Sequence, residues 1–170
     1  DGLKRVLSNA KRLQTLINDI LDLSKIEAGE LELADSSFET QSLVEAVESA
    51  VGESARKKGL GFSISLAPDM PEKIIGDEIR LAQIVLNLTD NAVKFTPEGT
   101  VSVVIGPVND THWQIQVRDT GRGIREEDFE RIFEEFQQVG SPSAETQPRG
   151  SGLGLAITRH LVHKMGGDIK

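Results

Sequence analysis

Cysteine is absent from this 170-residue sequence, and aromatic residues make up only 4% of it. Without cysteine the chain can form neither a disulfide nor a thiolate metal site. No stretch approaches the ~20 consecutive apolar residues of a membrane-spanning helix, and no signal peptide is recognisable. Basic residues are also scarce, because 19 Lys and Arg face 27 Asp and Glu, which gives a net charge of −8. This deficit argues against a nucleic-acid partner, whose phosphates need clustered cations.

The residues that are present are typical of a soluble globular domain, with 38% hydrophobic and 27% charged side chains. The length suffices for one ordinary domain and a small appendage. The sequence begins with Asp1 rather than methionine and ends at Lys170, where a further strand is expected to start. We therefore expect it to be a piece of a longer protein.

The first 29 residues differ in pattern from the rest. Apolar residues recur there in alternating steps of three and four, which predicts a long helix with a heptad seam. Additional leucines widen the seam beyond what a two-stranded coiled coil requires, so the pattern favours a helix of a bundle. An amphipathic helix lying on its own domain is the alternative. The seam consists of Leu3, Val6, Ala10, Leu13, Ile17 and Ile20.

Residues 30–170 mix helical and strand-like patterns without a regular alternation of the two. Such a mixture favours an α+β fold, in which helices and an antiparallel-rich sheet form a two-layer sandwich, over a doubly wound sheet. Alternating apolar residues predict strands at 60–66, 101–105 and 113–117, and helical spacing predicts helices at about 43–58, 77–95, 126–136 and 153–165.

Three polar residues mark the helix expected at 77–95. Asn87, Asn91 and Lys94 follow the spacing i, i+4, i+7, which places their side chains on one helical face. An amide oxygen suits Mg²⁺, which prefers oxygen ligands and keeps waters beside phosphates, and the lysine adds a charge for those phosphates. Asp90 is offset by one residue and is expected to point elsewhere. The pattern predicts a site for a nucleotide triphosphate and its metal.

Two glycine-rich stretches follow this helix. Asp119 ends a predicted strand, and Gly121 and Gly123 after it allow the backbone to approach a ligand closely. The carboxylate can accept a hydrogen bond from an exocyclic amine, although an Asp-x-Gly turn also occurs for purely structural reasons. The stretch 150–155 (GSGLGL) leads into the last expected helix, whose free N–H groups and dipole favour an anion. It is not a Walker motif, because no Gly-Lys-Ser/Thr follows.

In this order the motifs resemble those of the ATP-binding catalytic region of two-component sensor histidine kinases, a fold shared with DNA gyrase, mismatch-repair ATPases and a heat-shock chaperone class. Residues 87–96 (NLTDNAVKFT) are similar to the family's N box, 119–124 (DTGRGI) to its first glycine box and 129–136 (FERIFEEF) to its F box. Residues 150–155 match the second glycine box. Residues 22–29 (DLSKIEAG) resemble the end of the second helix of the dimerisation and phosphoacceptor hairpin.

The resemblance implies a fold of the histidine kinase and gyrase ATPase type, preceded by one long bundle helix. It places part of the hairpin at residues 1–29 and an ATP-binding domain with incomplete C-terminal strands at 30–170. ATP and Mg²⁺ would be the cofactors, with the metal on Asn91. The other residues implied in nucleotide binding are Asn87 and Lys94 beside the phosphates, Asp119 at the adenine amine, Gly121, Gly123 and Ile124 at the base, and Gly150, Ser151, Gly152, Leu153, Gly154 and Leu155 at the phosphates.

The resemblance also implies a reaction, in which the γ-phosphoryl group of ATP passes to a histidine and then to a response regulator. Related hydrolases carry a glutamate four residues before the metal asparagine, where it acts as general base. This chain has Asn87 there, and an amide cannot accept that proton, so transfer to a protein side chain is favoured. An ATP-binding regulatory module without kinase activity is the second interpretation, and a hydrolase of the same fold is the third.

The family's phosphoacceptor histidine lies on the first helix of the hairpin, which this sequence lacks. His112, His160 and His163 are therefore expected to be structural or solvent-facing, and we expect no catalytic histidine in the chain. The parent protein would dimerise through the hairpin and keep this part in the cytoplasm, whether or not it is anchored in a membrane. Residues 137–149 would form a lid over ATP, in which Arg149 either reaches a phosphate or faces solvent. Phe133 and Phe136 would anchor this lid to the core.

Overall fold

The computed structural model describes residues 2–138 and 151–170 of the chain. The chain divides into two compact units. Leu33–Arg125 form the first, and Asp1–Glu32 together with Glu126–Lys170 form the second. The two units are described in turn below.

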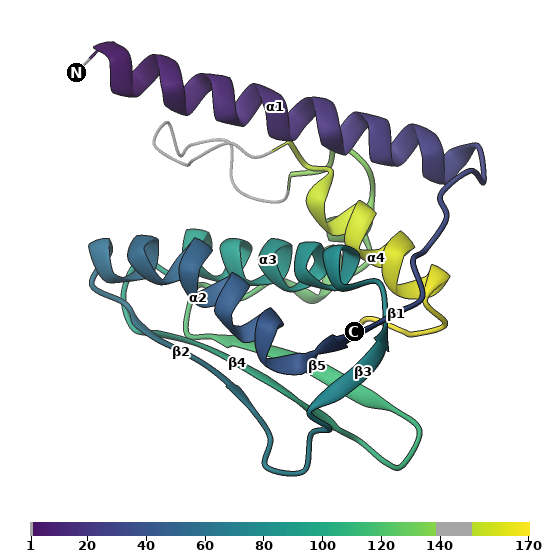
Figure 1. Ribbon diagram of the computed structural model, residues 1–170. Helices are drawn as coiled ribbons and strands as arrows, with labels where there is room; N and C mark the ends of the chain where they lie inside the picture. The colour runs from purple at the N-terminus through teal and green to yellow at the C-terminus, as the bar shows by residue number, and fades with distance from the viewer. Residues whose placement is uncertain (1, 139–150) are drawn as a thin grey trace. The chain divides into compact units, whose positions relative to one another are not determined.

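The first unit contains a three-stranded sheet of β2 (Gly61–Leu66), β4 (Thr100–Pro107) and β5 (Trp113–Asp119) in the order β2-β4-β5. β2 runs parallel to β4, and β4 runs antiparallel to β5. The helices α2 (Thr40–Lys57) and α3 (Glu78–Phe95) lie on the same side of this sheet, as Figure 1 shows. The expected two-layer α+β sandwich is therefore confirmed.

A second, two-stranded sheet lies beside the first and leads into α3. It pairs β1 (Ser36–Glu39) with β3 (Lys73–Gly76) in antiparallel register. Parallel strands need a long crossover connection, and here β3 and α3 together carry the chain from β2 back to β4. The crossover brings the C-terminal end of α3 to the start of β4.

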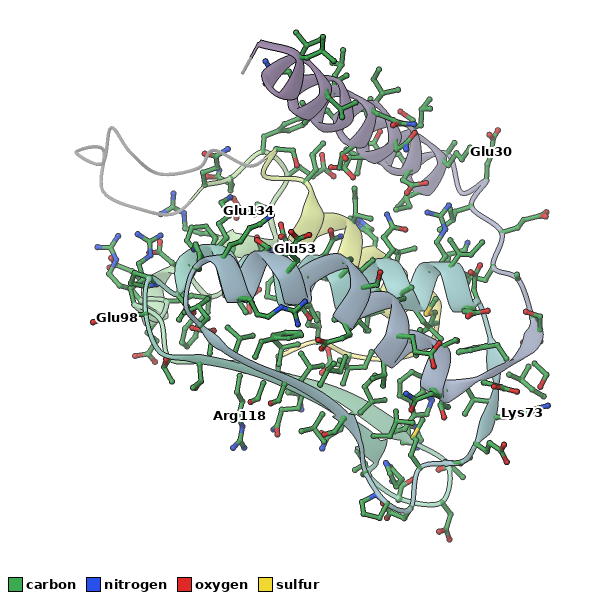
Figure 2. All side chains as sticks on the ribbon, turned by 60° about the vertical axis from the view of Figure 1, so that its left-hand side comes forward. Glu30, Glu53, Lys73, Glu98, Arg118 and Glu134 are labelled. Atoms are coloured by element: carbon green, nitrogen blue, oxygen red, sulfur yellow. The ribbon has the colours of Figure 1, made fainter. Side chains whose placement is uncertain are left out.

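The alternating pattern of β4 separates the two faces of the larger sheet. Val101, Val103 and Ile105 are at most 1% exposed, as expected for strand residues that face the helices. On the neighbouring strand β5, Arg118 extends away from α2 and α3 (Figure 2). The core of this unit therefore lies between the helices and one face of the sheet.

Asp77 fixes where α3 begins. Its Oδ1 accepts a hydrogen bond from the Arg80 N–H at 2.9 Å, which satisfies one free donor of the first turn. Its Oδ2 accepts from the Ala34 N–H, also at 2.9 Å. One buried carboxylate thus caps the helix and holds the segment before β1.

Replacement of this cap is expected to weaken the fold. Asp77→Ala removes both hydrogen bonds, and we expect it to lower the free energy of unfolding by about 1–2 kcal/mol. Urea unfolding measures the change. Asp110→Ala, at an exposed turn position, is the matched control and should change stability by less than about 0.5 kcal/mol. Equal effects of the two variants would show that the cap does not stabilise α3.

The second unit contains α1 (Gly2–Glu27), two short 3₁₀ turns and α4 (Gly154–Lys164). The 3₁₀ turns, η1 (Glu126–Asp128) and η2 (Arg131–Phe133), replace the continuous helix expected at 126–136, so that prediction is wrong. A local hydrogen bond and a contact with another helix together explain the difference. The buried Asp128 carboxylate accepts from Arg131 at 3.1 Å, and η2 packs against α4, so these contacts decide the chain path.

The predicted N-terminal helix is confirmed as α1, but its heptad seam is exposed. Leu23, outside the seam, is buried at 7%, and α1 contacts α4 within this unit. In the described ranges 2–138 and 151–170, no helix combines the length and apolar character that crossing a membrane requires. The exposed seam residues include Leu3 (89%), Val6 (68%), Leu13 (58%), Ile17 (50%) and Ile20 (50%).

Candidate nucleotide-binding site

One face of α3 carries the polar residues that the sequence singled out. Asn87, Asn91 and Lys94 all lie on this helix and are half-buried, whereas Asp90 is exposed. The Lys94 Nζ lies 4.8 Å from the centre of the Phe95 ring, a cation–π distance. The spacing i, i+4, i+7 therefore produces a single polar face, and Asp90 is not part of it.

The turn after β5 holds Asp119 in place. Asp119 Oδ1 accepts a hydrogen bond from the Gly121 N–H at 2.8 Å and another from the Thr96 hydroxyl at 3.4 Å. Asp119 itself is exposed, while Thr96 is fully buried. Two hydrogen bonds to one carboxylate oxygen fix the orientation of the whole group.

Gly121 lies against the end of α3 so closely that no side chain fits. A Cβ there would stand 2.6 Å from the Phe95 carbonyl oxygen, 2.8 Å from Asp119 Oδ1 and 3.0 Å from Thr96 Oγ1. The N-box helix and the first glycine box are thus packed backbone to backbone. Glycine is required at this position by space, as expected for a close approach.

The rest of the first glycine box is open. Gly123 has a φ of +69°, a left-handed conformation that favours glycine, and a Cβ there would meet nothing within 4 Å. Ile124 is 51% exposed. The Arg122 guanidinium lies 5.2 Å from the centre of the Phe95 ring. These residues present backbone, an apolar side chain and a cation beside Asp119.

Lys58 holds the end of α3, a role that the sequence pattern did not indicate beyond its place at a helix end. Its Nζ donates to the carbonyl oxygens of Val93 at 2.7 Å, Lys94 at 3.0 Å and Thr96 at 3.4 Å. The available signal was the absence of glycine after α3, because the last carbonyls of a helix need a donor when no glycine cap follows. Thr96 was quoted within the N box but was given no role.

The second glycine stretch lies in the other unit, at the start of α4. Gly152 has a φ of +75°, and a Cβ there would stand 2.9 Å from the Phe136 carbonyl carbon. The Phe136 N–H donates to the Gly152 carbonyl at 3.0 Å. Phe136 itself has a φ of +60°. This hydrogen bond therefore links Phe136 and Gly152 on either side of segment 139–150. Gly150, Arg149 and most of the expected lid lie outside the described residues.

Ser151 connects this stretch to α1. Its hydroxyl donates to Asp19 Oδ2 at 3.3 Å and accepts from the Leu153 N–H at 3.2 Å. Partial burial raises the pKa of the Asp19 carboxyl, an effect that the Ser151 hydrogen bond opposes and the Asp22 charge reinforces.

Since Leu153 is only 1% exposed, only its backbone can face a ligand. Gly154 and Leu155 form the first turn of α4.

The aromatic residues of the F box differ in their surroundings. The Arg159 guanidinium lies 5.8 Å from the centre of the Phe133 ring, and Arg159 also pairs with Glu130 at 3.6 Å. Phe133 is thus attached to α4. Phe136 is 65% exposed, so the expectation that it anchors to the core is wrong. The backbone bond to Gly152, rather than the ring, fixes its position.

Each of the three histidines contacts a residue close to it in the sequence. His112 is exposed and contacts the Thr111 hydroxyl at 2.8 Å through Nδ1. On α4, the exposed His160 Nδ1 lies 2.9 Å from the Ala156 carbonyl, and His163 lies 3.8 Å from Asp168. These are surface contacts of ordinary kind.

A divalent cation would find few protein ligands here. Across 2–138 and 151–170, no group of three or more His, Asp or Glu side chains is placed to hold a metal. The metal ligand that α3 offers is a side-chain amide oxygen, that of Asn91, and Lys94 lies on the same face. Such a set fits Mg²⁺ bound mainly by phosphate oxygens and waters, which is how this ion usually binds in nucleotide sites.

The chain is similar to known proteins. A family described as the histidine kinase-, DNA gyrase B-, and HSP90-like ATPases matches residues 76–170, which is more than half of the chain. The chain therefore belongs to this family. It is also similar to individual proteins over nearly its whole length.

Those relatives are sensor kinases. The chain is 41% identical to the signal transduction histidine-protein kinase BarA of Escherichia coli K12 and 38% identical to the sensor protein GacS of Pseudomonas syringae pv. syringae. Each alignment covers 99% of the chain but 19% of the relative. The chain thus spans about a fifth of their length.

Two solved structures share the fold. Full-length ShkA in complex with AMPPNP matches with a TM-score of 0.82 and 32% identity, over 97% of this chain and 34% of ShkA. The histidine kinase AdeS of Acinetobacter baumannii matches with a TM-score of 0.78 and 25% identity, over 99% of this chain and 75% of AdeS. The expected fold type is thereby confirmed.

Proposed function

We propose that this chain is the ATP-binding catalytic part of a sensor histidine kinase, which donates the γ-phosphoryl group of Mg·ATP to a histidine outside the sequence. The observation that carries the proposal is the close packing of the Asp119 turn against the C-terminal end of α3, the helix that bears the polar face, within one unit. Family membership and the AMPPNP in the ShkA structure support ATP as the nucleotide. The response regulator would then receive the phosphoryl group.

Each residue of the first unit receives a role. Asn91 would hold Mg²⁺ through its amide oxygen, with Asn87 and Lys94 beside the phosphates. The ion would supply positive charge that neutralises the phosphates during transfer. Asp119 Oδ2 would accept a hydrogen bond from the adenine amine, since the two hydrogen bonds described above both end on Oδ1. Gly121, Gly123 and Ile124 would line the base.

In the second unit the backbone N–H groups of 151–155 would bind phosphate oxygens. A glycine-rich entry to α4 suits this role, because the positive end of the helix dipole favours an anion there. Gly150 would belong to the same loop. Residues 137–149 would form the lid, and the chain would contribute no catalytic side chain of its own to accept the phosphoryl group.

Phosphoryl transfer is favoured over hydrolysis by Asn87. A general base four residues before Asn91 would activate water, and an amide cannot do so. The reaction would then rest on positioning and charge neutralisation of the phosphates. A regulatory ATP-binding module is the second candidate, but the complete α3 face and the intact Gly121 packing favour the kinase.

The exposed seam of α1 supports a homodimer of the parent protein through the hairpin. We assign residues 1–29 to the second hairpin helix and 30–170 to the ATP-binding domain. Seam residues such as Leu13 and Ile17 are at least half exposed, and burial of each against partner helices would contribute about 1.5–3 kcal/mol. We place this part of the parent protein in the cytoplasm, where ATP is available.

Transfer of label from γ-labelled ATP tests the function. We expect the parent protein, which includes the preceding hairpin helix, to become labelled on histidine in the presence of Mg²⁺, whereas the 170-residue chain alone binds ATP and stays unlabelled. Acid lability of the label identifies phosphohistidine.

The matched control is the parent protein with its phosphoacceptor histidine replaced by glutamine, which should bind ATP equally and remain unlabelled. ATP binding without any histidine label in the unaltered parent would favour the regulatory module. Steady release of phosphate without label would favour the hydrolase.

A further inference from the structure

The C-terminal end of α3 is held by a residue from another helix. α3 ends at Phe95, and its C-cap Thr96 adopts an extended conformation (φ −100°, ψ 105°) rather than the left-handed glycine cap. The Thr96 N–H satisfies only the Ala92 carbonyl. The carbonyls that follow in the last turn need other donors.

Lys58 supplies those donors. It is the C-cap residue of α2, and its ammonium group donates to the carbonyls of Val93, Lys94 and Thr96 at 2.7–3.4 Å. A cation at a helix C-terminus is also favoured by the helix dipole. One side chain therefore joins the ends of both helices of the sandwich and fixes where Thr96 begins its extended course.

The position of Thr96 in turn determines the position of Asp119. The buried Thr96 hydroxyl donates to Asp119 Oδ1, and the Thr96 and Phe95 atoms next to Gly121 leave no room for a Cβ. A shift of the α3 end is therefore expected to move the Asp119 turn. The hydrogen bonds run from Lys58 to the Thr96 carbonyl and from the Thr96 hydroxyl to Asp119.

We propose that Lys58 is a positioning residue for base recognition, which acts through Thr96 to orient the Asp119 carboxylate toward the nucleotide base. Lys58 does not touch the base; it sets the end of α3. The inference rests on the proposed assignment of Asp119 to the adenine amine. It extends that assignment to two residues, one on α2 and one after α3, that otherwise have no part in nucleotide binding.

Discrimination between ATP and ITP measures this role, because inosine carries a carbonyl where adenine carries the 6-amine. Lys58→Met removes the donors while keeping the length of the side chain. We expect its ATP affinity to fall by about fivefold and its ITP affinity to change little, so that the ratio of affinities shrinks. Isothermal titration calorimetry with Mg²⁺ gives both affinities.

Lys57→Met is the matched control. It removes the same charge one residue away, where the Lys57 side chain is 73% exposed and pairs with Glu53. A general loss of attraction for phosphates would affect both variants and both nucleotides alike. Thermal unfolding of the two variants measures any difference in stability, so that affinities are compared at a temperature where both are folded. Equal ATP/ITP ratios for Lys57→Met and Lys58→Met would overturn the proposal.

A double-mutant cycle tests the route through Thr96. Thr96→Val removes the hydroxyl at nearly constant shape and should reduce the ATP/ITP ratio as Lys58→Met does. If Lys58 acts through Thr96, the double variant should lose no more discrimination than Thr96→Val alone. Additive losses would mean that Lys58 acts by another route, which contradicts the proposal.

Asp119→Asn separates this inference from the assignment on which it rests. An unchanged ATP/ITP ratio in Asp119→Asn would show that Asp119 does not read the base, and the adenine assignment itself would fail. The ATP/ITP ratio could instead change in Asp119→Asn and stay unchanged in Lys58→Met. The assignment of Asp119 to the adenine amine would then stand, and only the positioning role of Lys58 would be excluded.

Discussion

Asn91→Ala is expected to abolish the increase in ATP affinity that Mg²⁺ produces. The amide oxygen of Asn91 is the protein ligand that we assign to the metal, and loss of one interaction with a charged group costs at least about tenfold in affinity. Titration of ATP with Mg²⁺ and with EDTA measures the increase directly. The expected result is a variant whose two affinities agree, while its fold is retained because Asn91 is only half-buried.

Asn109→Ala is the matched control for this experiment. Asn109 lies in the exposed turn between β4 and β5, where its side chain accepts from the Thr111 and His112 N–H groups. Asn109→Ala removes an amide group of the same kind from the same unit, and the increase in ATP affinity that Mg²⁺ produces should remain. If Asn91→Ala keeps the full Mg²⁺ effect as well, the metal is held elsewhere.

Gly121→Ala is expected to reduce ATP affinity by more than about tenfold, because the added methyl group displaces the Asp119 turn from the end of α3. The new Cβ would stand 2.6 Å from the Phe95 carbonyl, a backbone atom that cannot move without the helix. Overpacking of this kind also costs about 1–3 kcal/mol of stability. Nucleotide titration at low temperature, where the variant is folded, separates the two effects.

Gly106→Ala gives a control of equal steric severity. Gly106 lies on β4, at the end of the strand opposite to Thr100 and to the pairing with Asp119. A Cβ at Gly106 would stand 2.6 Å from the Ala67 side chain. It should destabilise the sheet and leave the affinity of the folded protein unchanged. An equal loss of affinity in both variants would attribute the effect to general destabilisation and not to the site.

Much of the site was predictable because its pattern is local. Helical periodicity alone places Asn87, Asn91 and Lys94 on one face, and strand alternation alone buries Val101 and Val103. The order of the motifs indicated the family before any contact was visible. The two periodic patterns depend on residues within one or two turns of each other, and each motif is a short continuous stretch, so the sequence carries them directly.

The failures of the sequence analysis have a common cause. The segment 126–136 has spacing that suits a helix, yet the Asp128–Arg131 bond and the packing of η2 on α4 divide it into two 3₁₀ turns. Phe136 looks like a core residue by type, yet its backbone bond to Gly152 leaves the ring exposed. Contacts with distant residues override local preference in both cases.

By itself the sequence indicated the family through the identity and order of its motifs. Spacing along the chain determined the helices α1 to α4, the strands of the larger sheet and the polar face of α3. The tertiary structure decided which residues hold that face in place. Thr96 and Asp119 are 23 positions apart, and Lys58 and Val93 are 35 apart, so their hydrogen bonds exist only once β3, α3 and β4 have closed the crossover. Separations of this length leave no periodic signal in a sequence, because the free energy that selects them comes from packing between elements.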